Sequence, residues 1–432
     1  MRVTFYTLGC KVNQTETGAL AQLFEENGYT VVPGGEAADV YVVNSCTVTN
    51  FGDQKSRKWL RRAKRENPGS VTVLTGCYPQ AFPKEAAAIS EADVVTGSGN
   101  RRAILADVQK VLEGEAERVI DIRPHRKGEA FEELPMDRFA EHTRAFVKVE
   151  DGCNRQCAYC VIPRARGPVR SRAETSILQE IRRLTEAGYK EIVLTAISLP
   201  SYGTDTGSSL VELVEKAAAV PGVERLRLGS LDPDMLCDED IARLAQVSKL
   251  CPQFHLSLQS GCDKTLRAMR RPYTTAQYAA IVEKLRAAFG DALSLTTDVI
   301  VGFPGETEED FAASLAFVTG QRFLKVHVFP YSRREGTPAY DFPAQVPEHE
   351  KENRSHRMTA AVEAVRAEEA SRMEGRRTDV LLETPLSATL FTGYTRQYLP
   401  VLVSAPGCKT GDIVPVTLGA WDGRRCRAEY AR

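Results

Sequence analysis

Residues 146–160 read Phe146-Val-Lys-Val-Glu-Asp-Gly-Cys153-Asn-Arg-Gln-Cys157-Ala-Tyr-Cys160 and place a β-rich run directly before three closely spaced cysteines. The run 146–149 predicts a strand, and the cysteines form a C-x3-C-x2-C pattern in the loop that follows. Loops at the carboxyl ends of strands carry the active sites of α/β barrels. The pattern therefore predicts a reactive or metal-binding loop at the mouth of a barrel.

The spacing of Cys153, Cys157 and Cys160 favours an iron–sulfur cluster over zinc. Three thiolates on one loop fit three corners of a [4Fe–4S] cluster. A structural zinc ion usually takes four ligands, and this loop offers three cysteines. A cluster with three protein ligands leaves one iron open, and that iron is able to chelate a substrate or cofactor.

Around this loop, residues 145–330 alternate strand and helix patterns six times. Six repeats are two fewer than a closed TIM barrel contains, so we expect a partial, TIM-like (β/α)6 barrel that is open on one side. An open side suits a bulky substrate. The strands are expected at 146–149, 191–195, 225–229, 254–258, 295–301 and 325–329, and the helices at 175–187, 209–219, 238–248, 275–289 and 308–318.

The N-terminal region predicts a separate parallel α/β sheet that is covered by helices on both faces. Strands are expected at 2–7, 40–43, 71–75 and 94–96, and helices at 16–27 and 54–66. Cys10, Cys46 and Cys77 each follow one of these strands. Because the carboxyl ends of parallel strands meet at one edge, these thiols are expected to converge there, with Asn13, Asn44 and Thr47 lining the edge. The alternative is three unrelated buried cysteines.

The sequence divides into four regions. Residues 1–112 form the N-terminal α/β domain and 113–142 a charged, proline-containing linker. Residues 143–375 form the barrel, together with a long charged helix at 348–374. Residues 376–432 predict a small all-β barrel, with short strands at 401–403 and 413–418.

Composition excludes several classes of protein. The chain has 432 residues, 43% hydrophobic and 26% charged, with a net charge of −1. It is neither disordered nor collagen-like nor a strongly basic DNA-coating protein, and no apolar run is long enough to span a bilayer. The N-terminus lacks a secretory apolar region, so we expect a cytoplasmic protein. Its eleven cysteines are then thiols or metal ligands rather than disulfides.

The other candidate ligands show no pattern. Five cysteines have no ligand spacing and are interpreted as buried or incidental thiols; they are Cys237, Cys251, Cys262, Cys408 and Cys426. The six histidines are scattered, without an H-x-x-x-H pair.

Basic residues are concentrated in three places despite the near-neutral net charge. Residues 51–70 carry seven basic and two acidic side chains, and residues 376–432 carry eight basic and five acidic. Guanidinium and ammonium groups at this density suit phosphate, although each could equally be a solvated face. The candidates are Lys55, Lys58, Arg61, Arg62 and Arg65 on the helix, and Arg164, Arg166, Arg170 and Arg172 after the cysteine loop.

Together these motifs resemble the radical S-adenosylmethionine methylthiotransferase family. The C-x3-C-x2-C loop with Tyr159 before its last cysteine, Thr297-Asp-Val-Ile-Val-Gly-Phe-Pro-Gly-Glu306 and His327-Val-Phe-Pro-Tyr-Ser332 are similar to its radical SAM domain. Thr7-Leu-Gly-Cys10-Lys-Val-Asn-Gln14, Asn44-Ser-Cys46-Thr and Thr75-Gly-Cys77-Tyr resemble its N-terminal domain. Residues 377–430, with Gly393-Tyr-Thr-Arg-Gln-Tyr398, resemble the RNA-binding TRAM domain, which adds Arg396 to the RNA-binding candidates.

The resemblance implies two [4Fe–4S] clusters and S-adenosylmethionine as cofactors. Cys153, Cys157 and Cys160 would hold the radical-generating cluster, and Cys10, Cys46 and Cys77 an auxiliary cluster that carries or supplies sulfur. One S-adenosylmethionine would donate the methyl group, and a second would yield the 5′-deoxyadenosyl radical. Tyr159, Gly302, Gly305 and Glu306 would contact the cofactor, although Gly-Phe-Pro-Gly also reads as a plain strand-to-helix turn. The resemblance assigns no further catalytic residue, and those beyond the cluster ligands stay unknown from the sequence.

Within the family, Gly9-Cys10-Lys-Val-Asn-Gln14 is most similar to the branch that acts on threonylcarbamoyladenosine beside the tRNA anticodon (position 37). The implied partners are the tRNA anticodon stem-loop and a small reductase, ferredoxin or flavodoxin as electron donor, with neither DNA nor a membrane. The chain departs from relatives at Ala196, Ser198 and Pro200, where they usually carry Gly and His.

Two other readings remain open. The first is the same chemistry on isopentenyladenosine, or on an aspartate of a ribosomal protein. The second is a non-enzymatic iron–sulfur protein that binds RNA or carries electrons. An electron carrier needs neither an open iron nor a six-repeat barrel, and S-adenosylmethionine cleavage under reducing conditions separates these classes.

Overall fold

The structure is a computed structural model that describes residues 1–134, 136 and 143–431. The end of the expected linker 113–142 and the final residue of the expected domain 376–432 lie outside the described residues. The chain forms two compact units. The first comprises Met1–Arg138, Lys148–Arg172 and Ser332–Tyr340, and the second comprises Phe139–Val147, Ala173–Tyr331 and Asp341–Arg432.

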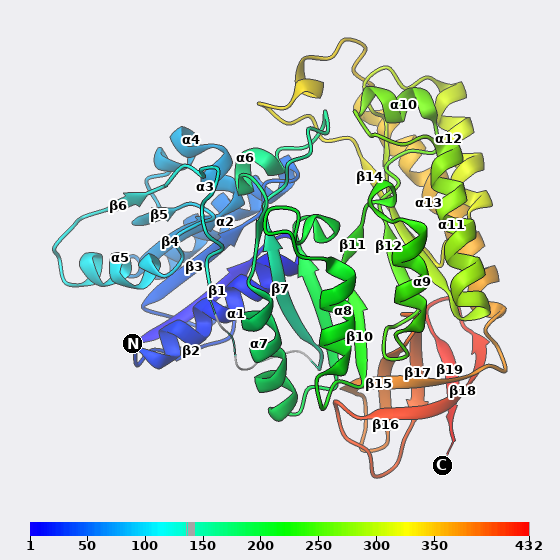
Figure 1. Cartoon of the computed structure of the whole chain (residues 1–432). Helices are drawn as coiled ribbons and strands as arrows, with labels where there is room; N and C mark the ends of the chain where they lie inside the picture. Colours follow the sequence, from blue (N-terminus) through cyan, green and yellow to red (C-terminus); the bar gives the residue numbers. More distant parts are fainter. Residues whose placement is uncertain (135, 137–142, 432) are drawn as a thin grey trace. The chain divides into compact units, whose positions relative to one another are not determined.

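The first unit is built on a six-stranded parallel sheet in the order β2-β1-β3-β4-β5-β6 (Figure 1). The expected parallel α/β sheet is thus confirmed. β6 lies in the range for which we expected only a linker. The strands are β1 (Arg2–Thr7), β2 (Thr30–Val31), β3 (Val40–Ser45), β4 (Val71–Gly76), β5 (Val94–Thr96) and β6 (Val119–Asp121), and the helices α1 (Lys11–Glu26), α2 (Asn50–Glu66), α3 (Cys77–Ala81), α4 (Pro83–Ala87) and α5 (Ala103–Leu112).

Both faces of this sheet are buried because apolar residues follow one another along its strands. Val43 of β3 packs with Leu60 of α2 in one core cluster, whereas the preceding Val42 packs with Leu20 and Phe24 of α1 in another. Successive side chains of a strand point to opposite faces, so a continuous apolar run requires helices on both sides.

Helix α1 begins at Lys11, earlier than the expected start at 16. Cys10 is its N-cap residue, with extended backbone at φ −86° and ψ 177°. The first turn contains Lys11 and the buried, polar Asn13, which break the apolar periodicity used to place the helix.

A short segment after β7 (Ala145–Asp151) belongs to the first unit and contains the C-x3-C-x2-C loop, α6 (Ile162–Arg166) and β8 (Arg170–Ser171). β7 and β8 pair antiparallel at Glu150↔Ser171 and Asp151↔Arg170. The cysteine loop therefore begins at the end of β7, and the chain returns as β8, which pairs with the end of β7.

The second unit contains the remaining strands of the open barrel, and the expected alternation of strands and helices is confirmed. The expected strand 225–229 is divided into two short strands, Arg225–Leu228 and Ser230–Leu231, which belong to different sheets. The sheets have the orders β10-β9-β7-β8 and β11-β12-β13-β14. Apart from β7, the strands are β9 (Glu191–Ala196), β10 (Arg225–Leu228), β11 (Ser230–Leu231), β12 (Gln253–Leu256), β13 (Ser294–Val301) and β14 (Lys325–Pro330), and the helices α7 (Glu174–Glu186), α8 (Leu210–Ala219), α9 (Asp238–Gln246), α10 (Asp263–Ala268), α11 (Thr275–Phe289), α12 (Glu308–Gly320) and α13 (Glu348–Ser371).

The chain ends in a closed five-stranded barrel in the order β15-β16-β17-β19-β18. Its interior is apolar, with Phe391, Val401, Val416 and Leu418 among the buried residues, as the alternating pattern predicted. The strands are β15 (Arg377–Pro385), β16 (Leu390–Thr395), β17 (Pro400–Ser404), β18 (Ile413–Trp421) and β19 (Cys426–Tyr430).

The five-stranded barrel is fastened to β10 by buried arginines. Arg225 donates to the carbonyl oxygen of Tyr394, and Arg227 to that of Arg396, each at 3.1 Å. Both guanidinium groups also bind the fully buried carboxylate of Glu191. Arg227 further lies 4.8 Å from the ring centroid of Tyr398. The motif Gly393–Tyr398 is therefore part of the packing within the second unit.

No helix within the described ranges is long and apolar enough to cross a membrane.

Candidate functional site

Cys10, Cys46 and Cys77 lie together at one edge of the N-terminal sheet. Cys10 follows β1, Cys46 follows β3, and Cys77 is the first residue of α3 after β4. These three strands are consecutive and parallel, so their carboxyl ends lie side by side. The sheet thereby collects three thiols that are far apart in the sequence.

The side chain of Asn13 lies among these thiols and connects the loops that carry them. Its Oδ1 accepts from Sγ of Cys10 at 3.7 Å and from Sγ of Cys77 at 4.0 Å. Its Nδ2 donates to the carbonyl oxygens of Leu8 at 2.8 Å and Ser45 at 3.0 Å. Because the two carbonyls require the amide nitrogen, Oδ1 must point toward the sulfur atoms.

Gly9 allows the first two cysteine loops to approach each other. Its φ is +107°, and an added Cβ would lie 2.8 Å from Cβ and 3.0 Å from Sγ of Cys46. L side chains rarely adopt that φ, and the contact is closer than van der Waals separation allows. The glycine before the first cysteine is thus required by the site's geometry.

Asn44 and Thr47 contribute hydrogen bonds at the same edge. Nδ2 of Asn44 donates to the carbonyl oxygen of Asn13 at 3.0 Å and to Oγ1 of Thr17 at 3.1 Å. Oγ1 of Thr47 accepts from Arg334 at 2.5 Å. Both side chains therefore stabilise the loops around the thiols.

Burial controls the ionisation of the two inner thiols. It raises the pKa of Cys46, and it raises the pKa of Cys77 to about 12, while the charge of Arg166 lowers both in part. Thiols of this kind stay protonated at neutral pH unless a metal ion displaces the proton. They are therefore not reactive exposed nucleophiles, and their role as metal ligands stays a prediction.

Arg166 contacts this site directly, although it follows the other cysteine triplet in sequence. Its side chain is 0% exposed, and its Nε donates to Sγ of Cys77 at 3.1 Å. A guanidinium against a sulfur atom favours an anionic group in this position.

A buried ion network surrounds that guanidinium. Glu16, 3% exposed, lies between Arg166, Arg101 at 2.8 Å and Lys148 at 2.7 Å. Burial alone would raise the pKa of Glu16, but the three cations hold it at about 2. Asp151 is held well below its usual pKa by Lys148 and Arg166 against the same cost of burial. Both carboxylates are therefore ionised within the core.

The expectation that the arginines after the cysteine loop bind phosphate is wrong for three of them. Arg166, Arg170 and Arg172 are 0%, 5% and 4% exposed. Arg164 is exposed, and its guanidinium lies 5.1 Å from the ring centroid of Phe82. The sequence shows that these arginines are close together along the chain. It does not show that buried carboxylates neutralise the three buried ones.

The loop of Cys153, Cys157 and Cys160 is held tightly at both ends. The amide of Cys153 donates to the carbonyl oxygen of Gly167 at 3.0 Å, and that of Cys160 to Cys157 at 3.1 Å. Gly152 has φ +95°, and an added Cβ would collide with the backbone oxygen of Pro168. A hollow of about 530 Å³ lies beside the loop, and its lining includes Cys153, Asn154, Arg155, Gln156, His125 and Arg164.

Both cysteine triads fit iron–sulfur clusters in their donor chemistry. Each offers three thiol donors, which leaves one iron of a [4Fe–4S] cluster without a cysteine from that triad. The Cys10, Cys46 and Cys77 thiols interact electrostatically with one another, and Arg166 supplies a cation for an anionic cluster. The Cys153 triad lies on one loop beside a hollow that has room for a further ligand.

Three of the residues expected to contact S-adenosylmethionine have structural partners of their own in the second unit. The amide of Gly302 donates to Oε2 of Glu306 at 2.6 Å, and the same oxygen accepts from Arg354 at 2.8 Å. Burial raises the pKa of Glu306, and these two donors lower it. Gly305 donates to the carbonyl oxygen of Ala344 at 2.9 Å. The motif therefore forms a strand-to-helix turn, which was its alternative interpretation.

Tyr159 is partly exposed within the cysteine loop of the first unit. Its contact with S-adenosylmethionine, like those of Gly302, Gly305 and Glu306, stays a prediction.

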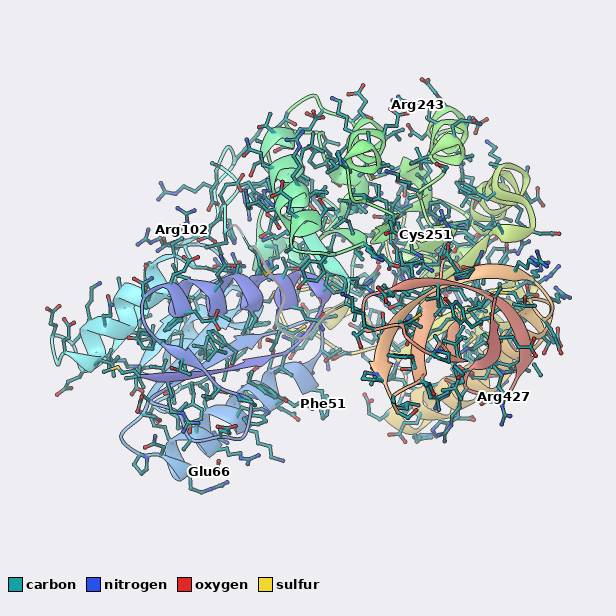
Figure 2. All side chains as sticks on the ribbon, turned by 90° about the horizontal axis from the view of Figure 1, so that it is seen from below. Phe51, Glu66, Arg102, Arg243, Cys251 and Arg427 are labelled. Atoms are coloured by element: carbon teal, nitrogen blue, oxygen red, sulfur yellow. The ribbon has the colours of Figure 1, made fainter. Side chains whose placement is uncertain are left out.

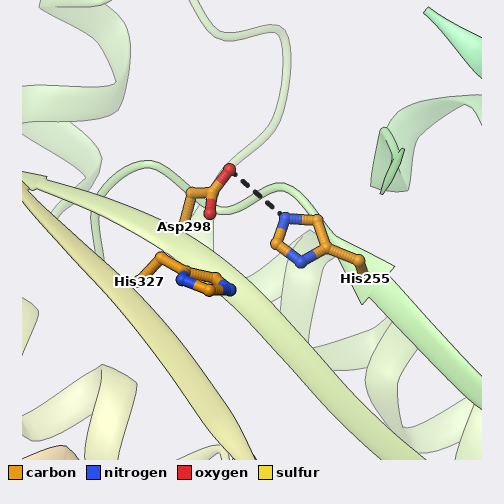
Figure 3. Close-up of side chains that lie close together, drawn as sticks. All are labelled: His255, Asp298 and His327. Carbon is orange, nitrogen blue, oxygen red and sulfur yellow. Dashed lines mark ion pairs between the residues drawn. The ribbon is translucent and has the colours of Figure 1, made fainter. Parts of the chain in front are cut away.

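Histidines that looked scattered in the sequence meet on neighbouring strands of the second unit (Figure 3). Nε2 of His255 on β12 lies 3.3 Å from Oδ2 of Asp298 on β13. In the strand register, Asp298 lies opposite His327 on β14. One ligand atom from each lies within 4.8 Å of the others. This donor set suits hydrogen bonding to a polar ligand or a divalent transition metal ion. Strand register, which sequence spacing does not reveal, brings these residues together.

The loop that departs from relatives forms the short helix η1 (Leu199–Ser201). Ser198 lies 2.8 Å from Ser201, oxygen to oxygen, and is 5% exposed. Pro200 lies inside the turn, where its missing N–H is tolerated.

The basic side chains on α2 project from the helix between the labelled Phe51 and Glu66 (Figure 2). Three of them pair with carboxylates: Arg61 with Glu91 at 3.0 Å, Arg62 with Glu66 at 2.8 Å and Arg65 with Glu66 at 4.0 Å. The expected RNA-binding residues here are the exposed Lys58, Arg61, Arg62 and Arg65 and the half-buried Lys55.

Arg396 has internal partners as well. Its Nη2 donates to the carbonyl oxygens of Ser248 at 2.5 Å and Leu250 at 3.1 Å. Its contact with RNA stays a prediction. Other arginines of the five-stranded barrel are exposed, including Arg427 (Figure 2).

Comparison with protein families matches the chain in two places. Residues 147–318 match the Radical SAM superfamily, and residues 2–97 match a family described as uncharacterized protein family UPF0004. The two matches contain the two cysteine triads separately.

Curated relatives align over most of the chain. A threonylcarbamoyladenosine tRNA methylthiotransferase, MtaB, of Bacillus subtilis (strain 168) is 41% identical over 96% of this chain and 93% of its own length. The protein of the same name from Aquifex aeolicus (strain VF5) is 39% identical over 82% of this chain and 86% of its own. A tRNA-2-methylthio-N(6)-dimethylallyladenosine synthase of Clostridium novyi (strain NT) is 34% identical over 95% of this chain and 92% of its own.

Among solved structures, the radical S-adenosylmethionine methyltransferase TsrM from Kitasatospora setae superimposes with a TM-score of 0.57. The match covers 78% of this chain and 73% of that chain at 15% identity. At this identity the likeness concerns the fold alone.

Proposed function

Because this chain belongs to the radical S-adenosylmethionine methylthiotransferase family, we propose that it converts threonylcarbamoyladenosine at position 37 of tRNA to its 2-methylthio derivative. The chain is a radical S-adenosylmethionine tRNA methylthiotransferase. The precise nucleoside, the second cluster and the use of two S-adenosylmethionine molecules per turnover are part of the proposal.

The observation that carries the proposal is the presence of two three-cysteine sites in one structural unit. Cys153, Cys157 and Cys160 would hold the cluster that belongs to the radical S-adenosylmethionine family. Cys10, Cys46 and Cys77 would hold the second cluster. An electron carrier has no use for two incompletely ligated clusters, whereas a sulfur insertion needs one site for the radical and one for the sulfur.

Cys153, Cys157 and Cys160 would hold a cluster with an open iron, which would supply a chelation site for S-adenosylmethionine and the electron for its cleavage. The protein's own residues position the loops: Asn13 orients the sulfur atoms of Cys10 and Cys77, and Gly152 permits the turn into Cys153. The carbon at position 2 of adenine bears an unactivated hydrogen, beyond the reach of an ordinary acid or base. A small reductase, ferredoxin or flavodoxin is the proposed electron donor.

Transfer RNA is the substrate class in the names of the relatives, and basic surfaces of both units support its binding here. Helix α2 presents Lys58 and Arg65 to solvent, and the five-stranded barrel presents Arg427. An adenine beside the anticodon must leave its stack to reach an enzyme's reacting groups. Exposed cations would hold the phosphates while the base is displaced.

The threonylcarbamoyl branch is favoured by the motif at the first cysteine and by the relatives. Lys11 and Val12 follow Cys10 in the pattern of that branch. Relatives carrying its name are 35–41% identical, compared with 32–36% for dimethylallyladenosine synthases, and the three most similar of these relatives carry the threonylcarbamoyl name. Modification of dimethylallyladenosine is the alternative within the same chemistry.

Mass spectrometry of tRNA nucleosides tests the proposal. The gene is expressed in a host that lacks this modification, and a variant with Cys157→Ala serves as the matched control. A gain of one methylthio group on threonylcarbamoyladenosine, absent from the control, is the expected result. The same gain on dimethylallyladenosine would move the chain to the other branch. Unchanged tRNA together with a methylthio group on a ribosomal protein would refute the tRNA substrate.

A further inference from the structure

Arg166 lies where the loop of the first cluster contacts the cysteines of the proposed second cluster. It is the last residue of α6, the short helix that follows Cys160, and its side chain is 0% exposed. A fully buried arginine is costly unless every donor finds a partner. Its partners therefore show what the residue holds.

All five N–H groups of Arg166 have an acceptor in the first unit. Nε donates to Sγ of Cys77 at 3.1 Å. Nη1 donates to Oε1 of Glu16 and, at 3.3 Å, to Oδ2 of Asp151. Nη2 donates to Oδ1 of Asn13 at 2.6 Å and to Oε2 of Glu16 at 3.1 Å. The planar guanidinium fork is thus fully used, and a lysine offers only a point charge with three donors.

Two of these acceptors belong to the second-cluster site, and one belongs to the start of the radical-cluster loop. Asp151 precedes Gly152 and accepts its amide at 2.9 Å. The amide of Cys153 in turn bonds to the carbonyl oxygen of Gly167, the neighbour of Arg166. One side chain therefore joins both ends of the Cys153 loop to the edge of the N-terminal sheet.

The contacts of Arg166 do not depend on the protons of the thiols. The bonds from Cys10 and Cys77 to Asn13 require sulfur-bound protons, which metal ligation removes. Arg166 has no such requirement, because its N–H groups donate to the sulfur of Cys77 and to Oδ1 of Asn13. A hydrogen bond and a positive charge at a ligand sulfur stabilise the reduced form of an iron–sulfur cluster.

We propose that Arg166 is a positioning residue that couples the two cysteine sites and makes the second cluster easier to reduce through its bond to the sulfur of Cys77. The inference rests on the proposed function, because it requires a cluster at Cys10, Cys46 and Cys77.

The test measures the reduction potential of the second cluster alone. The full chain with Cys153→Ala, Cys157→Ala and Cys160→Ala is reconstituted with iron and sulfide, and its potential is followed by electron paramagnetic resonance. Arg166→Gln is compared with Arg101→Gln, which removes another buried arginine from the same carboxylate, Glu16, but not from a sulfur. We expect Arg166→Gln to make the reduction equilibrium about tenfold less favourable, a shift of about −59 mV for one electron. Arg101→Gln should shift it much less.

Arg166→Lys is the second variant, and it decides the matter if Arg166→Gln fails to fold. It keeps the charge but loses the forked geometry, so its potential should lie between those of the parent and Arg166→Gln. Equal shifts in Arg166→Gln and Arg101→Gln, or an unchanged potential in Arg166→Lys, would overturn the inference. Full iron content after Cys10→Ala, Cys46→Ala and Cys77→Ala would instead refute the second cluster and hence the proposed function.

Discussion

The Nε2 atom of His255 lies 3.3 Å from Oδ2 of Asp298 on the next strand of the barrel sheet. On its other side, Nδ1 of His255 lies 3.0 Å from Oγ1 of Thr296. The imidazole is therefore hydrogen-bonded at Nδ1, whereas Nε2 is buried beside the carboxylate without a hydrogen bond to it, and the carboxylate lies opposite His327. An oriented imidazole of this kind is typical of a group that meets a polar ligand.

We expect Asp298→Asn to lower kcat/KM for tRNA methylthiolation at least about tenfold, with the fold retained. The amide keeps the size of the side chain but loses the charge that orients His255. Each tenfold loss corresponds to about 1.4 kcal/mol of lost stabilisation. Asp291→Asn, whose carboxylate is 96% exposed in the same unit, is the matched control. Equal activity of the two variants would show that the histidine–aspartate pair stabilises the fold and has no role in the reaction.

Iron content should separate the two cysteine triads. Reconstituted protein is expected to bind about eight irons per chain, because two [4Fe–4S] clusters hold four each. Changing Cys10, Cys46 and Cys77 together to alanine should leave about four irons and retain reductive cleavage of S-adenosylmethionine. Changing Cys153, Cys157 and Cys160 should also leave about four but abolish cleavage. Replacement of Cys237 and Cys408 by alanine is the control and should change neither quantity.

Neutralising exposed cations of α2 should weaken tRNA binding in a salt-dependent way. In the double variant with Lys58→Gln and Arg65→Gln, the plot of log tRNA affinity against log salt concentration should become less steep. Its slope should fall by about 0.9 for each phosphate that the variant no longer binds. These residues are chosen because Arg61 and Arg62 pair with carboxylates at 3.0 and 2.8 Å, whereas Arg65 lies 4.0 Å from Glu66. Lys64→Gln is the control, because Lys64 pairs with Asp93 at 2.6 Å beside the sheet. An unchanged slope in the double variant would make this face of α2 a solvated surface.

Glu191 should make the stability of the second unit depend on pH. Burial opposes its ionisation, but Arg227, Arg144 and Arg225 lower its pKa from 4.5 to about 2. A depressed folded-state pKa stabilises the fold above the unfolded-state pKa, and the stabilisation is lost as pH falls toward 2. The loss should reach about 3 kcal/mol, at ~1.4 kcal/mol per pKa unit.

Urea unfolding at pH 7, 4 and 3 checks this dependence by comparing the parent chain with Glu191→Gln. The parent should be more stable at pH 7, because the variant leaves buried arginines uncompensated, and the difference should shrink on acidification. Glu224→Gln, a change at a half-exposed glutamate, should show no such trend. A difference that stays constant from pH 7 to 3 would contradict the assignment.

The two glycines of the Gly302–Glu306 turn should respond differently to alanine. Gly302 has φ +71°, and its added Cβ would collide with Cγ of Lys351. Gly305 has φ +81° but open space around the added atom. Gly305→Ala should therefore cost about 1 kcal/mol from backbone strain, and Gly302→Ala more, because Lys351 must also move. Thermal unfolding measures both, and equal losses would show that Lys351 moves aside freely.

Local sequence patterns were enough to predict the parallel N-terminal sheet, the six barrel strands and the small C-terminal barrel. Runs such as Val40-Tyr-Val-Val43 report burial on two faces, because neighbouring side chains of a strand point in opposite directions. The position of Cys10, Cys46 and Cys77 after successive strands likewise predicted a shared edge, since parallel strands place their carboxyl ends together. These features depend on residues that are close in sequence or on one rule of sheet topology.

Contacts between distant segments required the folded chain. In the sequence, Arg166 looks like Arg164, and both suggested phosphate binding. The structure buries Arg166 against Glu16 and Asp151 and leaves Arg164 exposed. His255 and His327 likewise meet only because β12, β13 and β14 pair in one register. A charged side chain is stable in a core only beside compensating partners, and which partners are near is a property of the packed fold rather than of local spacing.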